Sequence, residues 1–324
     1  MRNTIVAAAF VCFSNLCIGQ QTIPSSQIPS KVITSQRQAE FTPVAATGAH
    51  EVRWGKGYLV SFPVGELKEP VSVYDRNGKL TFEKWPELKD AAKIFIQDAV
   101  PTEQGRVVLA ASAISRTGAM ADMLVEMGSD GVHRVIRTTP FYPLKVCTTQ
   151  TGTVWAFGKE LTDQRTAEPN REYKVLREYS FEQGEMKAVL ERSAIVPPPK
   201  VPLNGSKNDT FLKCGGDKLV LVLGATTELV EINLANHEVT RTPVTSLPPA
   251  SYMTGAAVTD AGDVYVSTLR PGKDATTELL RLKPDTSVIA ADAVKTSGST
   301  PGAFLLLGDD GGSLVYSRGR RAPT

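Results

Sequence analysis

Residues that could perform acid–base or metal chemistry are few and scattered in this chain. It has only three histidines, His50, His133 and His237, and they lie far apart in the sequence. No HExxH, CxxC or GxSxG motif and no Walker loop is present, so the common arrangements for zinc, thiol redox chemistry, a serine nucleophile or phosphate are missing. The sequence therefore predicts structural or surface histidines, no catalytic metal and no cofactor.

The elements that must position any site are indicated by glycine-bounded turns, each followed by a short apolar run. These turns lie at residues 57, 105, 152, 217, 262 and 312, in steps of 45 to 50 residues apart from one step of 65. A repeat of this length is typical of a β-propeller blade. A second series of turns, near residues 78, 131, 184, 237 and 286, runs in phase with the first. The two series predict an all-β fold, a six-bladed β-propeller.

Within each repeat, the pattern predicts four strands. In the fifth repeat these are 254–259, 263–268, 278–282 and 287–292, and the second strand of each repeat is apolar on nearly every residue, as expected for burial on both faces. The segment 257–267 resembles the NHL-repeat type of six-bladed propeller, a resemblance that implies the fold and no particular activity. The long step is expected to hold extended loops at 158–171 and 197–209 rather than a seventh blade.

The last repeat lacks its outer strands, because only a tail at 318–324 follows its second strand at 313–317. A hairpin within 31–44, with its turn at 35–38, is expected to supply these strands and to close the ring, which hides exposed sheet edges. The propeller is then expected to span 31–317, after a flexible segment at 20–30.

The first 19 residues have the pattern of a secretory signal peptide. Arg2 precedes the apolar stretch Ile5–Phe13, and Gly19 is a small residue suited to cleavage. The apolar stretch is too short for a stable transmembrane span. We therefore expect a secreted or periplasmic protein with no membrane association.

Charge gives little indication of a partner. The chain has 36 basic and 34 acidic residues, and Arg2 lies in the predicted leader. Such a balance provides no field to attract nucleic acid or an anionic membrane. A protein or small-molecule ligand is the expected partner, and the protein is expected to be monomeric.

Two cysteines remain after the predicted cleavage, Cys147 and Cys214, on or beside the first strands of the third and fourth repeats. An oxidising compartment favours a disulfide between them. Their unequal distances from the following turns favour two buried free thiols, because disulfide geometry is strict. Both alternatives stay open at this point.

Binding residues are expected in the long connections at one end of the blades. In an up-and-down blade, the second-to-third-strand loops and the connections between blades share one end, and here both sets are long. Arginines and aromatic residues, which are enriched at binding hot spots, gather in these loops. The candidate binding residues are Phe141, Tyr142, Arg165, Arg171, Lys200, Tyr252 and Arg270.

An enzymatic alternative rests on residues 51–54. The sequence Glu51-Val-Arg-Trp54 resembles the entry of the gluconolactonase and senescence-marker propellers, and the resemblance implies a divalent cation bound by carboxylate and asparagine oxygens. Glu51 and Asn204 would be the ligands, although the Gly-Pro of that family is missing between Glu51 and Trp54. The interpretation we favour is an exported propeller that acts as a binding or interaction module, with a lactonase-like hydrolase or lyase as the alternative.

Overall fold

The structure is a computed structural model that describes residues 5–8, 35–39, 50–195, 210–223, 228–244, 252–270, 276–282, 288–294, 304–310 and 313–318. The chain divides into two compact units. Unit 1 combines Met1–Ala45 with Gly205–Thr324, and unit 2 is the continuous segment Ala46–Asn204.

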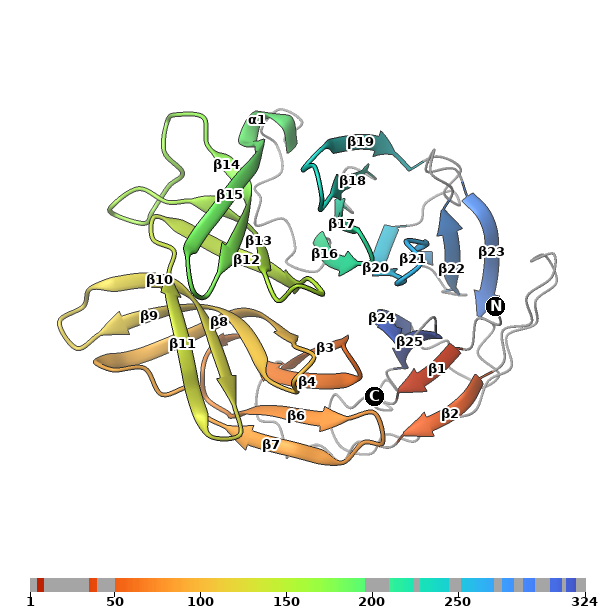
Figure 1. Ribbon diagram of the computed structural model, residues 1–324, viewed down its shortest axis with the longest axis horizontal. Helices are drawn as coiled ribbons and strands as arrows, with labels where there is room; N and C mark the ends of the chain where they lie inside the picture. Colours follow the sequence, from red (N-terminus) through yellow and green to blue (C-terminus); the bar gives the residue numbers. More distant parts are fainter. Residues whose placement is uncertain are drawn as a thin grey trace. The chain divides into compact units, whose positions relative to one another are not determined.

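Unit 2 contains three antiparallel sheets (Figure 1). The first consists of β3 (His50–Gly55), β4 (Tyr58–Pro63), β6 (Val71–Asp75) and β7 (Leu80–Lys84). The second consists of β8 (Ala91–Pro101), β9 (Val107–Ser115), β10 (Met120–Gly128) and β11 (Gly131–Arg137), and the short β5 (Gly65–Glu66) pairs with β8. The third consists of β12 (Phe141–Thr148), β13 (Val154–Glu160), β14 (Lys174–Ser180) and β15 (Gly184–Glu191), and the one-turn α1 (Arg192–Ile195) follows it.

The described residues of unit 1 also form three sheets. The first consists of β16 (Thr210–Gly215), β17 (Lys218–Leu223), β18 (Glu228–Asn233) and β19 (Val239–Pro243). The second consists of β20 (Tyr252–Val258), β21 (Val264–Arg270), β22 (Thr276–Leu282) and β23 (Val288–Val294). The third consists, in spatial order, of β2 (Ser35–Ala39), β1 (Ile5–Ala8), β25 (Ser313–Arg318) and β24 (Phe304–Asp310).

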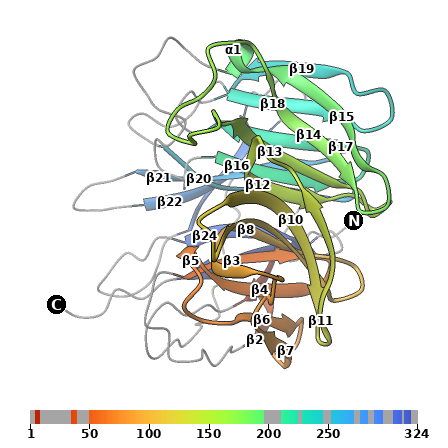
Figure 2. The same cartoon turned by 90° about the vertical axis from the view of Figure 1, so that its left-hand side faces the viewer.

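Neighbouring sheets of each unit pack face to face through their apolar second strands. In unit 2, Val60 and Phe62 of β4 join one buried cluster with Leu109 of β9, and Ala110 of β9 joins a second cluster with Ala156 of β13. Figure 2 shows these three sheets stacked one upon another. The unbroken apolar second strands of the sequence are therefore buried on both faces, as predicted.

The turns of the two predicted series are confirmed where the structure describes them. Gly78 and Gly105 both adopt positive φ, at 81° and 70°, which an L side chain disfavours. In the described part of the 65-residue step, the connection between β13 and β14 contains no strand and no helix. The other predicted loop, at 197–209, lies outside the described residues.

The fold class is confirmed as all-β with propeller-like sheets, but the blade count differs from the prediction of six. Five sheets follow the antiparallel order of a blade, whereas the sheet of β2, β1, β25 and β24 has parallel β2–β1 and β1–β25 pairs. The turn predicted at 35–38 is wrong, because these residues belong to strand β2. The strand beside β25 is Ile5–Ala8, from the predicted signal peptide, and the rest of the predicted hairpin lies outside the described residues.

β-Bulges occur in the first strands of several sheets. The register shifts between Ile96 and Asp98 in β8 and between Pro143 and Lys145 in β12, and similar shifts occur in β20 and β24. A bulge re-aims the side chains that follow it and is common beside functional sites. In unit 2, the residues that follow these two bulges are charged.

Removing the N-terminal segment should destabilise the sheet that contains β25. We expect chains that start at residue 20 or 29 to stay soluble, because segment 31–44 remains available to pair with β25 after loss of the leader. A chain that starts at residue 45 should aggregate or melt far lower, because β25 then presents an unpaired edge. Size-exclusion chromatography and thermal melting of the three chains test this. Equal melting temperatures for the chains starting at 29 and 45 would rule out a structural role for this segment.

Candidate functional site

Buried charge distinguishes unit 2 from the described part of unit 1. Six charged residues of unit 2 are at most 9% exposed: Asp98, Asp122, Glu126, Lys145, Glu160 and Arg177. The buried polar residues described in unit 1 are uncharged: Thr259, Ser267 and Thr268. Because a buried charge is costly unless it is paired, each of these residues requires a fixed partner.

The first group of paired charges lies on the first strands of the three sheets. We call Glu51, Arg53, Asp98 and Lys145 the inner-strand cluster. The Arg53 guanidinium lies 2.6 Å from Glu51 Oε2 and 2.9 Å from Asp98 Oδ1, and Lys145 Nζ lies 3.8 Å from Glu51 Oε2. Burial disfavours the charged form of Arg53, but Asp98 and Glu51 outweigh this effect and raise its pKa.

This cluster bears on the predicted cation site. Two carboxylates are balanced by two cations, so Glu51 already has cationic partners in Arg53 and Lys145. Asn204, the other proposed ligand, lies outside the described residues. Within the described residues, no group of three or more His, Cys, Asp or Glu side chains could hold a metal ion. The described geometry therefore adds no support to the lactonase-like alternative.

The second group lies at the end of unit 2 that carries the connections between β9 and β10, between β11 and β12, and between β13 and β14. We call this end the loop end. We call Gln97, Ser112, Asp122, Tyr142 and Arg165 the loop cluster. Asp122 has no exposed surface, and its carboxylate accepts hydrogen bonds from both terminal nitrogens of Arg165 and, at 2.7 Å, from the Ser112 hydroxyl.

Arg165 and Tyr142, which the sequence predicted as binding residues, meet in this cluster. The Arg165 guanidinium carbon lies 5.9 Å from the centre of the Tyr142 ring. Burial raises the pKa of Tyr142, whose hydroxyl also hydrogen-bonds Gln97. Arg165 lies between β13 and β14 in the left-handed backbone region, at φ 58°. The long loop thus delivers its arginine to a buried carboxylate of the neighbouring sheet.

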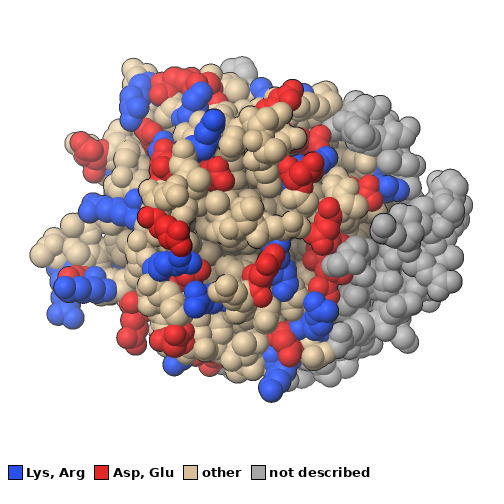
Figure 3. Space-filling view, in the orientation of Figure 1, with Lys and Arg blue, Asp and Glu red and all other residues tan. Residues whose placement is uncertain are grey.

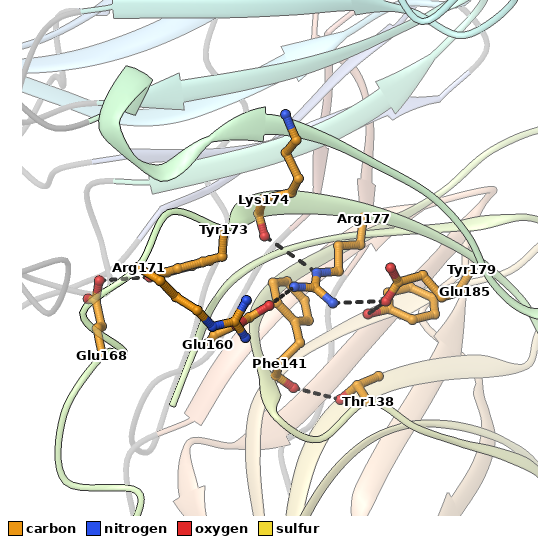
Figure 4. Close-up of polar contacts among 10 residues, drawn as sticks. All are labelled: Thr138, Phe141, Glu160, Glu168, Arg171, Tyr173, Lys174, Arg177, Tyr179 and Glu185. Carbon is orange, nitrogen blue, oxygen red and sulfur yellow. Dashed lines mark hydrogen bonds and ion pairs between the residues drawn. The ribbon is translucent and has the colours of Figure 1, made fainter. Parts of the chain in front are cut away.

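The third group surrounds Glu160 at the end of β13 (Figure 4). Its two carboxylate oxygens accept hydrogen bonds from Arg171 and Arg177, both at 2.5 Å. Arg177 also donates to Glu185 at 2.9 Å and lies 4.4 Å from the centre of the Phe141 ring. Burial disfavours the charged Arg177, but Glu185 and Glu160 outweigh it and raise the pKa.

The predicted binding residues therefore differ in availability. Phe141 is fully buried beneath Arg177 and belongs to the core, so it cannot contact a ligand. Tyr142 is half-buried, and the Arg165 side chain is 15% exposed, whereas that of Arg171 is 63% exposed. Lys200 lies outside the described residues, as do the side chains of Tyr252, on β20, and Arg270, on β21.

A contact that sequence reasoning missed involves His50, at the start of β3. Its Nε2 lies 2.6 Å from Glu69 Oε2, and its Nδ1 lies 3.2 Å from the Ser61 hydroxyl oxygen. The three residues share no recognisable motif spacing. Only the pairing of β3 with β4, in which Val52 lies opposite Ser61, brings Ser61 near His50. His133 instead pairs with Asp130 at 2.6 Å, and His237 occupies a turn at φ 61°.

The two cysteines among the described residues are oxidised. Cys147 and Cys214 are each disulfide-bonded. Of the two alternatives that the sequence left open, the free thiols, based on unequal distances from the following turns, are therefore wrong.

The surface charges are mixed. Figure 3 shows Lys and Arg interleaved with Asp and Glu over the described part of the face in view. Among the described residues, no helix has the length and hydropathy needed to cross a bilayer.

Comparison with known proteins gives fold-level likeness at low identity. No protein-family model and no curated protein matches the sequence. A protein of unknown function from Bacteroides caccae is 10% identical, with a TM-score of 0.47, over 86% of this chain and 89% of that chain. A Bacteroides fragilis protein described as exported is 9% identical, with a TM-score of 0.47, over 75% of this chain and 72% of that chain. Likeness at this level carries no argument about activity.

Breaking the Asp122–Arg165 pair should destabilise unit 2 strongly. Arg165→Met leaves a buried carboxylate without its main partner and should reduce the free energy of unfolding by about 3–5 kcal/mol. The double variant Arg165→Met/Asp122→Asn should lose less, because it removes the buried charge. Lys93→Met, at the exposed pair with Glu66, is the control and should cost less than about 1 kcal/mol. Urea unfolding measures all three, and a double variant less stable than the single variant would contradict this account.

Acid should release the loop that carries Arg165 and Arg171. Burial raises the pKa of Glu168, but hydrogen bonds from Arg192 and Tyr173, each at 2.7 Å, outweigh burial and lower it. A carboxylate with a lowered pKa in the folded state stabilises the protein above its ordinary pKa, and this stability is lost as pH falls through the folded-state pKa.

The loss of stability between about pH 5 and pH 3 should therefore be smaller in Glu168→Gln than in the wild type. Tyr173→Phe, which removes one of the two hydrogen bonds, should give an intermediate slope. Melting temperature measured against pH tests this, and identical acid slopes in the wild type and Glu168→Gln would be the contrary result.

Proposed function

We propose that this protein is an exported β-propeller that acts as a binding or interaction module for a protein or small-molecule ligand. The observation that carries the proposal is the exposed guanidinium of Arg171 at the loop end of unit 2. It is 63% exposed and pairs with Glu160, a buried carboxylate that Arg177 also contacts. Glu160 therefore keeps a cationic partner when Arg171 turns toward a ligand.

The surroundings of Arg171 support this role. The nearby loop is held by the Glu168–Arg192 and Asp122–Arg165 pairs, so a contact surface here loses little conformational freedom on binding. Arginine is enriched among the residues that dominate binding energies, and rigid scaffolds commonly carry their binding residues on loops. A ligand that offers a carboxylate or another planar anion fits the guanidinium best.

Export is supported by two independent features. The leader pattern at residues 1–19 is one, and the disulfide-bonded state of Cys147 and Cys214 is the other. Disulfides persist in oxidising compartments and are rare in the cytosol. We propose a periplasmic or secreted location.

Arg171→Ala should weaken ligand binding without unfolding the protein, because Arg177 still pairs with Glu160. Loss of a hot-spot side chain costs about 2 kcal/mol, roughly a 30-fold rise in Kd. Arg134→Ala is the matched control, since its side chain is 41% exposed and also pairs with a buried glutamate, Glu126. Calorimetric titration with a partner recovered by cross-linking measures both. Cross-links confined to the turns at Gly78, Gly131 and Gly184 would place binding at the other end of the blades.

A further inference from the structure

His50, Ser61 and Glu69 form a connected polar group that the binding role does not use. His50 Nδ1 lies 3.2 Å from the Ser61 hydroxyl, and His50 Nε2 lies 2.6 Å from the Glu69 carboxylate. A hydroxyl, an imidazole and a carboxylate in this order are the three parts of a serine nucleophile site, which is identified by geometry and not by sequence position. We propose that these residues form a hydrolytic site for carboxylic esters.

The fold holds the three groups on rigid supports. Ser61 lies on β4 between Val60 and Phe62, both with no exposed surface, so its backbone is fixed by the core. His50 begins β3, which pairs with β4, and Glu69 lies two residues before β6, which also pairs with β4. One sheet therefore positions the nucleophile, the base and the carboxylate.

Burial matches the role of each group. The side chains of His50 and Glu69 are 11% and 13% exposed, so their contact is shielded from water and fixes the imidazole ring. Ser61 is partly exposed, as a nucleophile must be. An ion pair that served only to anchor the segment before β6 would not need a hydroxyl at the second imidazole nitrogen. That second contact carries the inference.

The reaction balances with groups that are present. The Ser61 oxygen attacks the ester carbonyl carbon while its proton moves to His50 Nδ1, and the carbonyl electron pair moves to oxygen. The tetrahedral intermediate collapses, the C–O bond to the alcohol breaks, and His50 returns the proton to the leaving alcohol. Water, activated by the same imidazole, then hydrolyses the acyl-serine. Glu69 stabilises the transient imidazolium and is a positioning residue.

A fluorophosphonate probe tests the nucleophile directly on the full-length protein. The expected result is one covalent adduct, located by peptide mass spectrometry on Ser61 of the wild type, together with hydrolysis of p-nitrophenyl acetate. Ser61→Ala should abolish both, because it removes only the hydroxyl oxygen and leaves the His50–Glu69 contact intact. No adduct, or an adduct only at other residues, overturns the proposal without any variant.

Ser72→Ala is the matched control. Ser72 lies directly opposite Ser61 on β6 and donates a hydrogen bond to Glu83 at 3.0 Å. Its replacement should leave labelling and hydrolysis unchanged. His50→Gln should reduce kcat by at least about 100-fold, the usual contribution of a general base. Glu69→Gln should reduce kcat with little change in KM, whereas a fall in melting temperature with unchanged kcat would assign Glu69 to structure alone and overturn its positioning role.

Discussion

The packing of apolar second strands between neighbouring sheets is the interaction on which everything else in this protein depends. Each such strand buries both faces, as in Leu219–Leu223, where every side chain is at most 5% exposed. Burial of this kind gives roughly 25 cal/mol per Å² of apolar surface, which is enough to fix the sheets within each unit. Fixed sheets allow the first strands and the loops to carry side chains that are unfavourable for stability.

In unit 2, several of these unfavourable side chains are buried charges. Its buried carboxylates are held by arginines, from within one sheet at Glu160 and across sheets at Asp122. Replacing such pairs by apolar residues is often neutral or stabilising in other proteins, so stability alone gives a weak account of why they are present. The buried charge pairs of unit 2 lie beside the bulges of β8 and β12 and at the long loop between β13 and β14. This concentration favours a functional role for that region of unit 2. In the described part of unit 1, by contrast, the buried polar residues are uncharged.

The sequence predicted the parts of this fold that depend on local chemistry. Positive-φ turns such as Gly105 and unbroken apolar runs such as Leu219–Leu223 can be read directly, since each depends on neighbouring residues. Tyr142 and Arg165, two of the predicted binding residues, lie near each other in the structure, but the sequence did not indicate their partner Asp122. That contact joins residues 43 positions apart through an inter-sheet register that no local pattern encodes.

Bulges account for other side-chain positions that the sequence did not predict. One extra residue in β8 or β12 changes which side chain faces its neighbours, so the positions of Asp98 and Lys145 could not be derived from strict alternation. The His50–Ser61 contact was missed for a related reason. It depends on the pairing register of β3 and β4, and searches for short motifs ignore such registers.

The pairing of β1 with β25 has a consequence for the order of folding. Unit 2 is one continuous stretch of chain, so all of its contacts are available as soon as that stretch has been synthesised. Unit 1 is split, and its sheet of β2, β1, β25 and β24 joins segments from opposite ends of the sequence. Contacts of such long range form slowly, because the closure entropy of the intervening chain is lost before they contribute. Unit 2 therefore has the topology of the part that folds first, and the last sheet of unit 1 has that of the step that completes the molecule.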